Sequence, residues 1–256
     1  MFSCYVFYGL SLITIDNLKR TTPMKPSKSL VASLVSVSLF SIALGSETLP
    51  PTAEEQKALT PAAVLKDLME GNKRYVAGEV SAPNIEARIE ATSTGQNPKA
   101  YILSCVDSRV PVEQVFDQGI GDIFVGRVAG NIEDVSQLGS MEFATAAAGA
   151  KLVLVLGHEA CGAVKGACDH VKLGNLTELL AEIEPAVNAV QGFEADDKNS
   201  KNKDFVAAVV DKNVRMTVAD IRKRSKVLSD LEKEGKITIV GALYSLQDGS
   251  VTLIEE

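Results

Sequence analysis

Short apolar runs alternate with segments of helical spacing through the middle of the chain. The runs at 100–105 ("AYILSC"), 122–130 ("DIFVGRVAG") and 151–158 ("KLVLVLGH") are rich in β-branched residues, which is typical of strands buried on both faces. Between them, residues 111–117 and 134–149 have the composition of helices. Strands that alternate with helices predict an α/β fold with a central, mostly parallel sheet flanked by helices.

The two ends of this region carry different patterns. Before the first strand, apolar residues recur at helical spacing over 61–77, with Thr60 as the N-cap and a proline at the first helical position, so we expect an amino-terminal helical arm. After 161 the chain is mostly helical, with one long segment over about 202–234. Residues 236–255 form two apolar, β-branched runs on either side of Asp248-Gly249, a turn sequence, and so predict a carboxy-terminal hairpin. Residues 61–256 are expected to form a single domain.

The amino end has the pattern of an exported protein. From Met24 the chain has a charged region, an apolar core that is too short for a comfortable membrane span, and small residues up to Gly45. We expect residues 1–45 to be an upstream extension plus a signal peptide, with Met24 as the true start and export to the periplasm. The alternative is an organelle-targeting extension. Residues 46–60 are polar with a Pro-Pro pair and are expected to be an extended leader. No cysteine lies directly after the apolar core, where a lipid would be attached, so no lipid anchor is expected.

Composition limits the kind of partner. Hydrophobic residues make up 46% and charged residues 23% of the 256, as in ordinary globular proteins. The formal net charge of -7 argues against a nucleic-acid partner, because neutralising phosphates needs a basic surface. A small or neutral ligand agrees better with this balance.

Candidate chemistry lies where the expected strands end. Cys105 ends the first run, His158 ends the third, and Cys161 follows at a strand-to-helix turn. Loops at the carboxyl ends of parallel strands converge, so these side chains are expected to meet. Two thiolates and one imidazole suit zinc and leave its fourth position open, as in catalytic sites. Taken alone, His-x-x-Cys is a weak signal, since buried cysteines and histidines are also ordinary core residues.

Asp107 and Arg109 follow Cys105 closely. An aspartate held by an arginine stays ionised and can accept a hydrogen bond from a metal-bound water. The alternative is a surface ion pair without a role in chemistry. The neighbouring cysteine favours the first interpretation.

The stretch "CVDSRVP", followed by "GHEACGAV", resembles the β-class carbonic anhydrases, whose signature is Cys-x-Asp-x-Arg with a downstream His-x-x-Cys. The similarity runs from about residue 60 to the end and includes "GDIFVGRVAGN" and "VGALYSLQDGSV". This resemblance implies one zinc ion per subunit, held by Cys105, His158 and Cys161. It further implies that Asp107 and Arg109 form the dyad that holds zinc-bound hydroxide. The implied substrate-binding residues are Gln96, Phe124, Ala129, Phe143 and Gly162.

The implied activity is the reversible hydration of carbon dioxide to bicarbonate and a proton. A carbonyl sulfide or carbon disulfide hydrolase on the same scaffold, or a non-catalytic zinc-stabilised binding protein, remains an alternative. The resemblance also implies a homo-oligomer, dimer or tetramer, with the site near the subunit interface. Closed, bicarbonate-regulated members carry a Trp just before the first zinc cysteine. This chain has no Trp, and Ile102 stands there, so an open site is expected at neutral pH.

Overall fold

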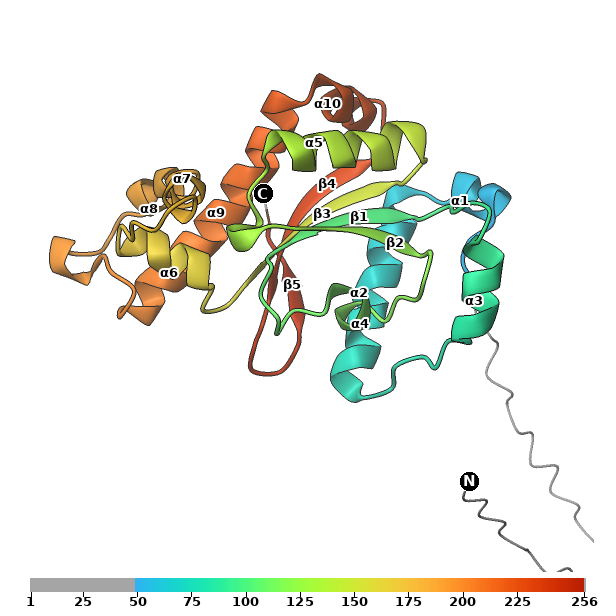
Figure 1. Cartoon of the computed structure of the whole chain (residues 1–256), viewed down its shortest axis with the longest axis horizontal. Helices are drawn as coiled ribbons and strands as arrows, with labels where there is room; N and C mark the ends of the chain where they lie inside the picture. Colours follow the sequence, from blue (N-terminus) through green and yellow to red (C-terminus); the bar gives the residue numbers. More distant parts are fainter. Residues whose placement is uncertain (1–48, 256) are drawn as a thin grey trace, which may run out of the picture. The chain divides into compact units, whose positions relative to one another are not determined.

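One five-stranded sheet forms the centre of the computed structural model, which describes residues 49–255. The strands are β1 (Ala100–Ser104), β2 (Ile123–Arg127), β3 (Leu152–His158), β4 (Thr238–Tyr244) and β5 (Val251–Leu253). Their order in the sheet is β2-β1-β3-β4-β5 (Figure 1). The pairs β1–β2, β1–β3 and β3–β4 are parallel, and β4–β5 is antiparallel. The predicted α/β class with a mostly parallel sheet is confirmed.

Burial explains why the two central strands, β1 and β3, are continuous apolar runs in the sequence. Every residue of β1 and of β3 is buried, because helices cover both faces of the sheet there. The edge strand β2 is only partly buried. The expectation of a strand buried on both faces is therefore confirmed for β1 and β3 and wrong for β2, which lies at an edge of the sheet.

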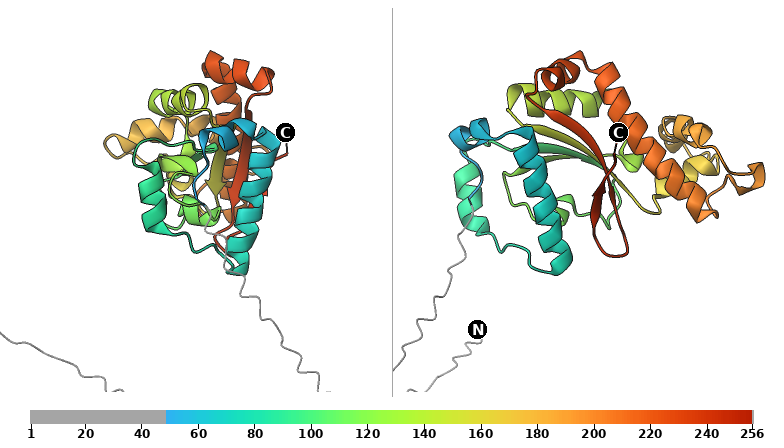
Figure 2. Two further views of the ribbon diagram at one scale, coloured as in Figure 1. Left: turned by 90° about the vertical axis from the view of Figure 1, so that its right-hand side faces the viewer. Right: turned by 180° about the vertical axis from the view of Figure 1, so that it is seen from behind.

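Helices occupy both faces of the sheet (Figures 1 and 2). The α-helices are α1 (Ala53–Ala58), α2 (Pro61–Ala77), α3 (Ile85–Thr92), α4 (Val112–Val115), α5 (Val135–Glu142), α6 (Gly162–Cys168), α7 (Leu176–Ala181), α8 (Glu184–Ala189), α9 (Lys203–Arg224) and α10 (Lys226–Lys233). Two short 3-10 helices, η1 (Ala129–Asn131) and η3 (Ala195–Asp197), and one π-helical turn, η2 (Phe143–Ala147), complete them. One core cluster joins α2 and α4 to the sheet, and another joins α5, α9 and α10 to its opposite face.

The amino-terminal helix is present with the expected bounds, and it packs on the sheet of its own chain. Helix α2 begins at Pro61 after the Thr60 side chain, which accepts a hydrogen bond from the Ala63 amide, and ends before Gly78 in the left-handed conformation, at φ 72°. Asn72 ties this helix to the rest of the fold. Its side chain donates to the carbonyls of Val115 and Gly249 and accepts from the Val251 amide.

Two expectations about helices need correction. The leader expected to be extended over 46–60 contains α1, where Thr52 and Glu55 form a reciprocal capping box. Its Gln56 side chain donates to the carbonyls of Pro98 and Ala148, so this segment is docked on the fold. The long helix expected over 202–234 is two helices. It breaks at Ser225, whose hydroxyl accepts from the Leu228 amide as the N-cap of α10.

The carboxy-terminal hairpin is confirmed, with Gly249 at φ 77° in its connection. Ser245 and Ser250 pair through the backbone and close the loop. Among residues 49–255, no helix is long and apolar enough to cross a membrane. The upstream extension and signal peptide expected within 1–45 lie outside the described residues.

Candidate metal centre

The three expected ligands lie together at the carboxyl edge of the sheet. Cys105 follows β1, His158 is the last residue of β3, and Cys161 is the N-cap of α6. Because β1 and β3 are parallel neighbours with Ser104 opposite Leu156, their ends reach the same edge. Ala160, at φ 52°, makes the turn that brings Cys161 back beside His158. The sulfurs and an imidazole nitrogen all lie within 4.8 Å of one another.

The distance between the two sulfurs fits a shared zinc ion. Sγ of Cys105 and Sγ of Cys161 are 3.9 Å apart, and both cysteines are free and buried. Two sulfurs at ~2.3 Å from one zinc, at a tetrahedral angle, would be about 3.8 Å apart. The pair is therefore too far apart for a disulfide and correctly spaced for one metal ion.

His158 has the orientation of a metal ligand. Its side chain is wholly buried, and Nδ1 lies 2.9 Å from the Glu159 carbonyl oxygen. An Nδ1–H that donates to this carbonyl leaves the lone pair on Nε2. That Nε2 atom is buried and has no hydrogen-bond partner. A buried nitrogen without a partner is costly, and a metal between it and the thiols would satisfy it.

The two thiols are joined by one hydrogen bond, in which either sulfur can be the donor. This contact lowers the pKa of Cys105 and raises the pKa of Cys161. The amide of Gly130 also donates to the Cys105 sulfur, at 3.4 Å. A divalent cation would replace the proton between the two sulfurs and stabilise both thiolates, which is the chemistry expected of a zinc site.

Asp107 and Arg109 form the expected pair beside the cluster. Nε and Nη2 of Arg109 donate to the two carboxylate oxygens of Asp107, at 2.9 and 2.7 Å. The Arg109 guanidinium holds the pKa of this carboxyl well below its usual range. Oδ2 of Asp107 lies 3.8 Å from Nε2 of His158, so an ionised carboxylate stands next to the ligand atoms.

Arg127, at the end of β2, holds the loop that carries these groups, and sequence reasoning missed it. Its Nε donates to the Cys105 carbonyl at 2.9 Å, and its Nη2 donates to the Asp107 carbonyl at 2.5 Å. The sequence offered one signal, an arginine inside the apolar run expected to be a strand over 122–130. A side chain that donates to backbone carbonyls produces no recognisable residue spacing, so the contacts of Arg127 with Cys105 and Asp107 could not be predicted from the sequence.

The residues expected to bind substrate fall into two groups. Gly162, which opens α6, follows Cys161 directly, and Ala129, in η1, precedes Gly130, whose amide donates to the Cys105 sulfur. Gln96 lies beyond the opposite end of β1, separated from Cys105 by about 16 Å of strand. The structure does not bring Gln96 to the metal cluster of its own subunit.

Phe124 and Phe143 contact each other, with ring centroids 6.0 Å apart and an interplanar angle of 66°. They line an open groove between β2 and α5 together with Tyr101, Arg127 and Gln137. None of the three metal-cluster residues is among the described residues that line this groove. The Phe143 side chain is 58% exposed. A substrate-binding role for Gln96, Phe124 and Phe143 stays a prediction.

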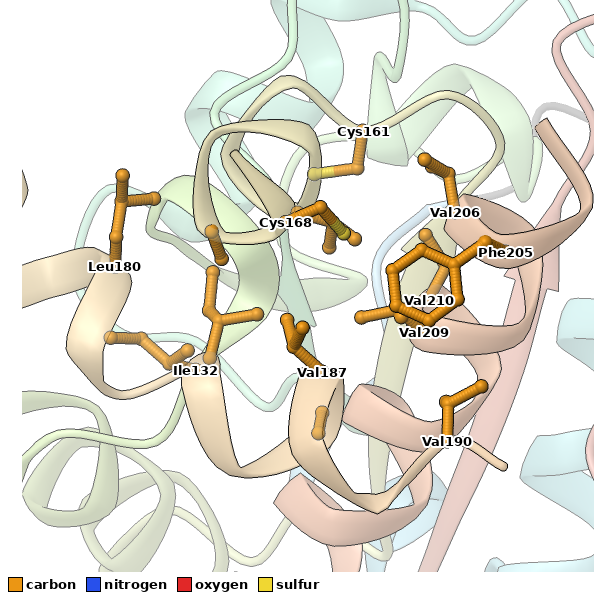
Figure 3. Packing of buried hydrophobic residues seen from close by; sticks show 14 of the residues in the cluster. Ile132, Cys161, Cys168, Leu180, Val187, Val190, Phe205, Val206, Val209 and Val210 are labelled. Atoms are coloured by element: carbon orange, nitrogen blue, oxygen red, sulfur yellow. The ribbon is translucent and has the colours of Figure 1, made fainter. Parts of the chain in front are cut away.

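Two further details concern small residues. Gly157 precedes His158, and Gly162 follows Cys161. A Cβ at Gly157 would lie 2.5 Å from Cγ2 of Val214, so this glycine lets α9 pack on β3, whereas a Cβ at Gly162 would meet open space. Cys168 is a core residue, packed with Val187 and Val209 in the cluster shown in Figure 3.

Comparisons with known proteins point to the same chemistry. The family model described as carbonic anhydrase matches residues 100–251. The chain is 37% identical to "Carbonic anhydrase 2" of Mycobacterium tuberculosis over 199 residues, which cover 75% of this chain and 92% of that protein. The fold is similar to a β-carbonic anhydrase of Coccomyxa, with a TM-score of 0.59 and 22% identity over 75% of this chain and 86% of that one.

A tetrameric β-carbonic anhydrase of Sordaria macrospora has a TM-score of 0.57 and 20% identity, over 76% of this chain and 95% of that one. At this identity the solved structures show the fold alone, whereas the mycobacterial relative and the family model cover the cluster itself. The chain belongs to the β-class of the carbonic anhydrase family.

Proposed function

We propose that the protein catalyses the reversible hydration of carbon dioxide with one zinc ion held by Cys105, His158 and Cys161. The observation that carries this proposal is the buried Nε2 of His158, which lacks a hydrogen-bond partner and lies within 4.8 Å of two free thiols. Only these three side chains form a potential metal cluster among residues 49–255. Structural zinc sites normally have four protein ligands, so three favour a catalytic site with room for substrate.

Zinc bound there supplies the Lewis acidity that makes water nucleophilic near neutral pH. The surrounding residues of the chain hold the ligand side chains in position. His158 is fixed by its contact with the Glu159 carbonyl, and Cys105 by the Gly130 amide. These buried contacts hold the ligand atoms in place before substrate arrives.

Asp107 would orient the reacting water. Its carboxylate stays ionised because Arg109 donates two hydrogen bonds to it, and an ionised carboxylate can only accept. A hydrogen bond accepted from the water would direct a lone pair toward carbon dioxide. The pairing with Arg109 also favours the open form, in which Asp107 does not take the fourth metal position. Ile102, wholly buried in β1 at the place of the regulatory Trp, supports an open site at neutral pH.

The substrate pocket would need a second subunit. Gln96, Phe124 and Phe143 lie away from the cluster of their own subunit, and Phe143 and Val106 expose large apolar side chains. We propose a homo-oligomer in which these three residues complete the site of the partner. The similarity to tetrameric relatives supports an oligomer of this kind.

We also propose export to the periplasm with removal of residues 1–45, on the order of charged, apolar and small residues upstream of Ser46. Mass spectrometry of the native protein tests this point. A mature chain that begins at Ser46 supports export, and an intact Met1 contradicts it.

Stopped-flow hydration of carbon dioxide by the zinc-loaded protein tests the main proposal. The wild type should accelerate hydration above the buffer rate, and Cys161→Ser and Asp107→Ala should reduce kcat strongly. Cys168→Ala is the matched control, because it removes a buried thiol that is not one of the three metal-cluster residues. A zinc-loaded wild type without any rate above buffer would overturn the proposal.

A further inference from the structure

Helix α9 contacts two glycines beside the metal cluster, Gly157 and Gly130, through two neighbouring residues. Val214 packs against Gly157, the residue before His158, so closely that a Cβ there would lie 2.5 Å from its Cγ2. Asn213 donates from Nδ2 to the Gly130 carbonyl at 2.8 Å. Helix α9, orange in Figure 2, runs across one face of the sheet and packs on β3 and β4. One helix therefore holds the backbone at two points beside the ligand set.

Asn213 is a polar residue on the mostly apolar buried face of α9, and its hydrogen bond to Gly130 accounts for its presence there. The buried face of α9 is mostly apolar, with Val209, Val210 and Ile221 in the core, and Asn213 is only 3% exposed. A buried carboxamide costs stability unless it is hydrogen-bonded. Its partner, Gly130, is 83 residues away in the sequence and belongs to the loop above Cys105.

The backbone conformation of Gly130 has to be fixed for its amide to stay on the Cys105 sulfur. It has φ 76°, and a Cβ there would lie 2.5 Å from Cδ1 of Ile183, so the loop requires glycine. Glycine is also the residue with the most backbone freedom. Its amide donates to the Cys105 sulfur at 3.4 Å, while its carbonyl accepts from Asn213. Because both groups flank one Cα, fixing the carbonyl restricts the rotation that would carry the amide away from the sulfur.

We propose that Asn213 is a positioning residue that keeps the Gly130 amide on the Cys105 sulfur and so weakens electron donation from that thiolate to the bound metal. This inference rests on the proposed zinc site. Hydrogen bonds to coordinating sulfurs tune metal centres, and partners of this kind are typically worth 10- to 100-fold in metal affinity or activity. With two thiolate ligands the metal is a weak Lewis acid, and this contact would make it a stronger one.

Cobalt substitution gives a readout that a purely structural role would not move. We compare the thiolate-to-cobalt charge-transfer band of the wild type, of Asn213→Leu, and of Thr217→Val as the matched control on the same buried face of α9. Without the Gly130 hydrogen bond the sulfur is a stronger donor, so Asn213→Leu should move the band to lower energy. In the zinc protein its kcat should fall about 10- to 100-fold with KM unchanged. Thr217→Val should keep the wild-type band.

The outcomes separate this inference from the proposed function. A folded Asn213→Leu protein with the wild-type band overturns the role of Asn213 and leaves the zinc site standing. A wild type without any sulfur-to-cobalt band overturns the metal site and this inference with it. If Asn213→Leu does not fold, Asn213→Ser, whose short hydroxyl is expected not to reach the Gly130 carbonyl, is judged by the same band shift.

Discussion

The guanidinium of Arg109 holds the Asp107 carboxylate by two parallel hydrogen bonds, 2.9 Å from Nε and 2.7 Å from Nη2. The same carboxylate lies 3.8 Å from Nε2 of His158. Arg109 therefore determines both the charge and the direction of this acidic group beside the ligand atoms. A planar fork is well matched to a carboxylate, and a lysine would lose the second hydrogen bond.

Replacing Arg109 should damage turnover without removing the metal. We expect Arg109→Ala to lower kcat about 100-fold, because Asp107 is no longer aimed at the reacting water. Arg109→Lys should retain part of the activity, since it keeps the charge and loses the fork. Zinc content and stopped-flow rates measured on the same samples check this. An Arg109→Ala protein with full zinc and wild-type kcat would rule out the proposed role of the pair.

The stability provided by Asp107 should depend on pH only under acid conditions. Arg109 lowers the pKa of this carboxyl in the folded protein, so its contribution is fully present above the unfolded pKa of ~3.9 and is lost as the pH falls toward the folded pKa. The difference in unfolding free energy between wild type and Asp107→Asn should stay constant from pH 8 to about 5 and shrink below about 4. Denaturant unfolding across this range measures it, and shrinkage between pH 8 and 6 would contradict the assignment.

Arg127 should control how firmly the cluster retains its metal. It donates to the carbonyls of Cys105 and Asp107, and so fixes the loop that carries one ligand and the carboxylate. We expect Arg127→Gln to weaken zinc retention about 10- to 100-fold, as other supporting contacts of metal ligands do. Competition with a chelator measures the effect. The control is Arg215→Gln, an exposed arginine paired with Asp211 on α9, which should release zinc like the wild type.

Mixing two inactive variants tests whether subunits share sites. Cys161→Ser removes a ligand, and a Phe124→Ala and Phe143→Ala double variant removes the aromatic pair. If the pair serves the partner, each mixed dimer has one intact site, and a random equal mixture recovers about a quarter of the wild-type rate. If the pair serves its own subunit, both sites of every mixed dimer carry a defect, and the mixture stays inactive.

The sequence predicted the two central strands because their apolar runs are local patterns, and it grouped Cys105 with His158 because the carboxyl ends of parallel strands meet at one edge. Continuous apolar runs marked β1 and β3, and Cys105 and His158 stand where those runs end. The helix at 61–77 followed from its N-cap and spacing. The structure confirms these strands and this helix, and it brings Cys105, His158 and Cys161 together as a potential metal cluster.

The missed features depend on contacts between distant segments. The break at Ser225 places its hydroxyl on Glu142, 83 residues away, and no local signal shows this. Asn213 on Gly130 and Arg127 on the Cys105 loop are likewise contacts that only the folded chain creates. Gln96 and the aromatic pair were grouped with the cluster by resemblance, which does not say to which subunit a residue contributes.

X-ray absorption at the zinc edge of the purified protein near neutral pH tests the central claim most directly. Zinc bound by Cys105, His158 and Cys161 should show two sulfurs at ~2.3 Å and two lighter ligands at ~2.0 to 2.1 Å. One lighter ligand is the His158 nitrogen, and the other is an exchangeable oxygen, so Asp107→Asn should leave the four-atom shell unchanged. A spectrum with three or four sulfurs, or a shell in which Asp107→Asn removes the second light atom, would contradict an open zinc site at this cluster.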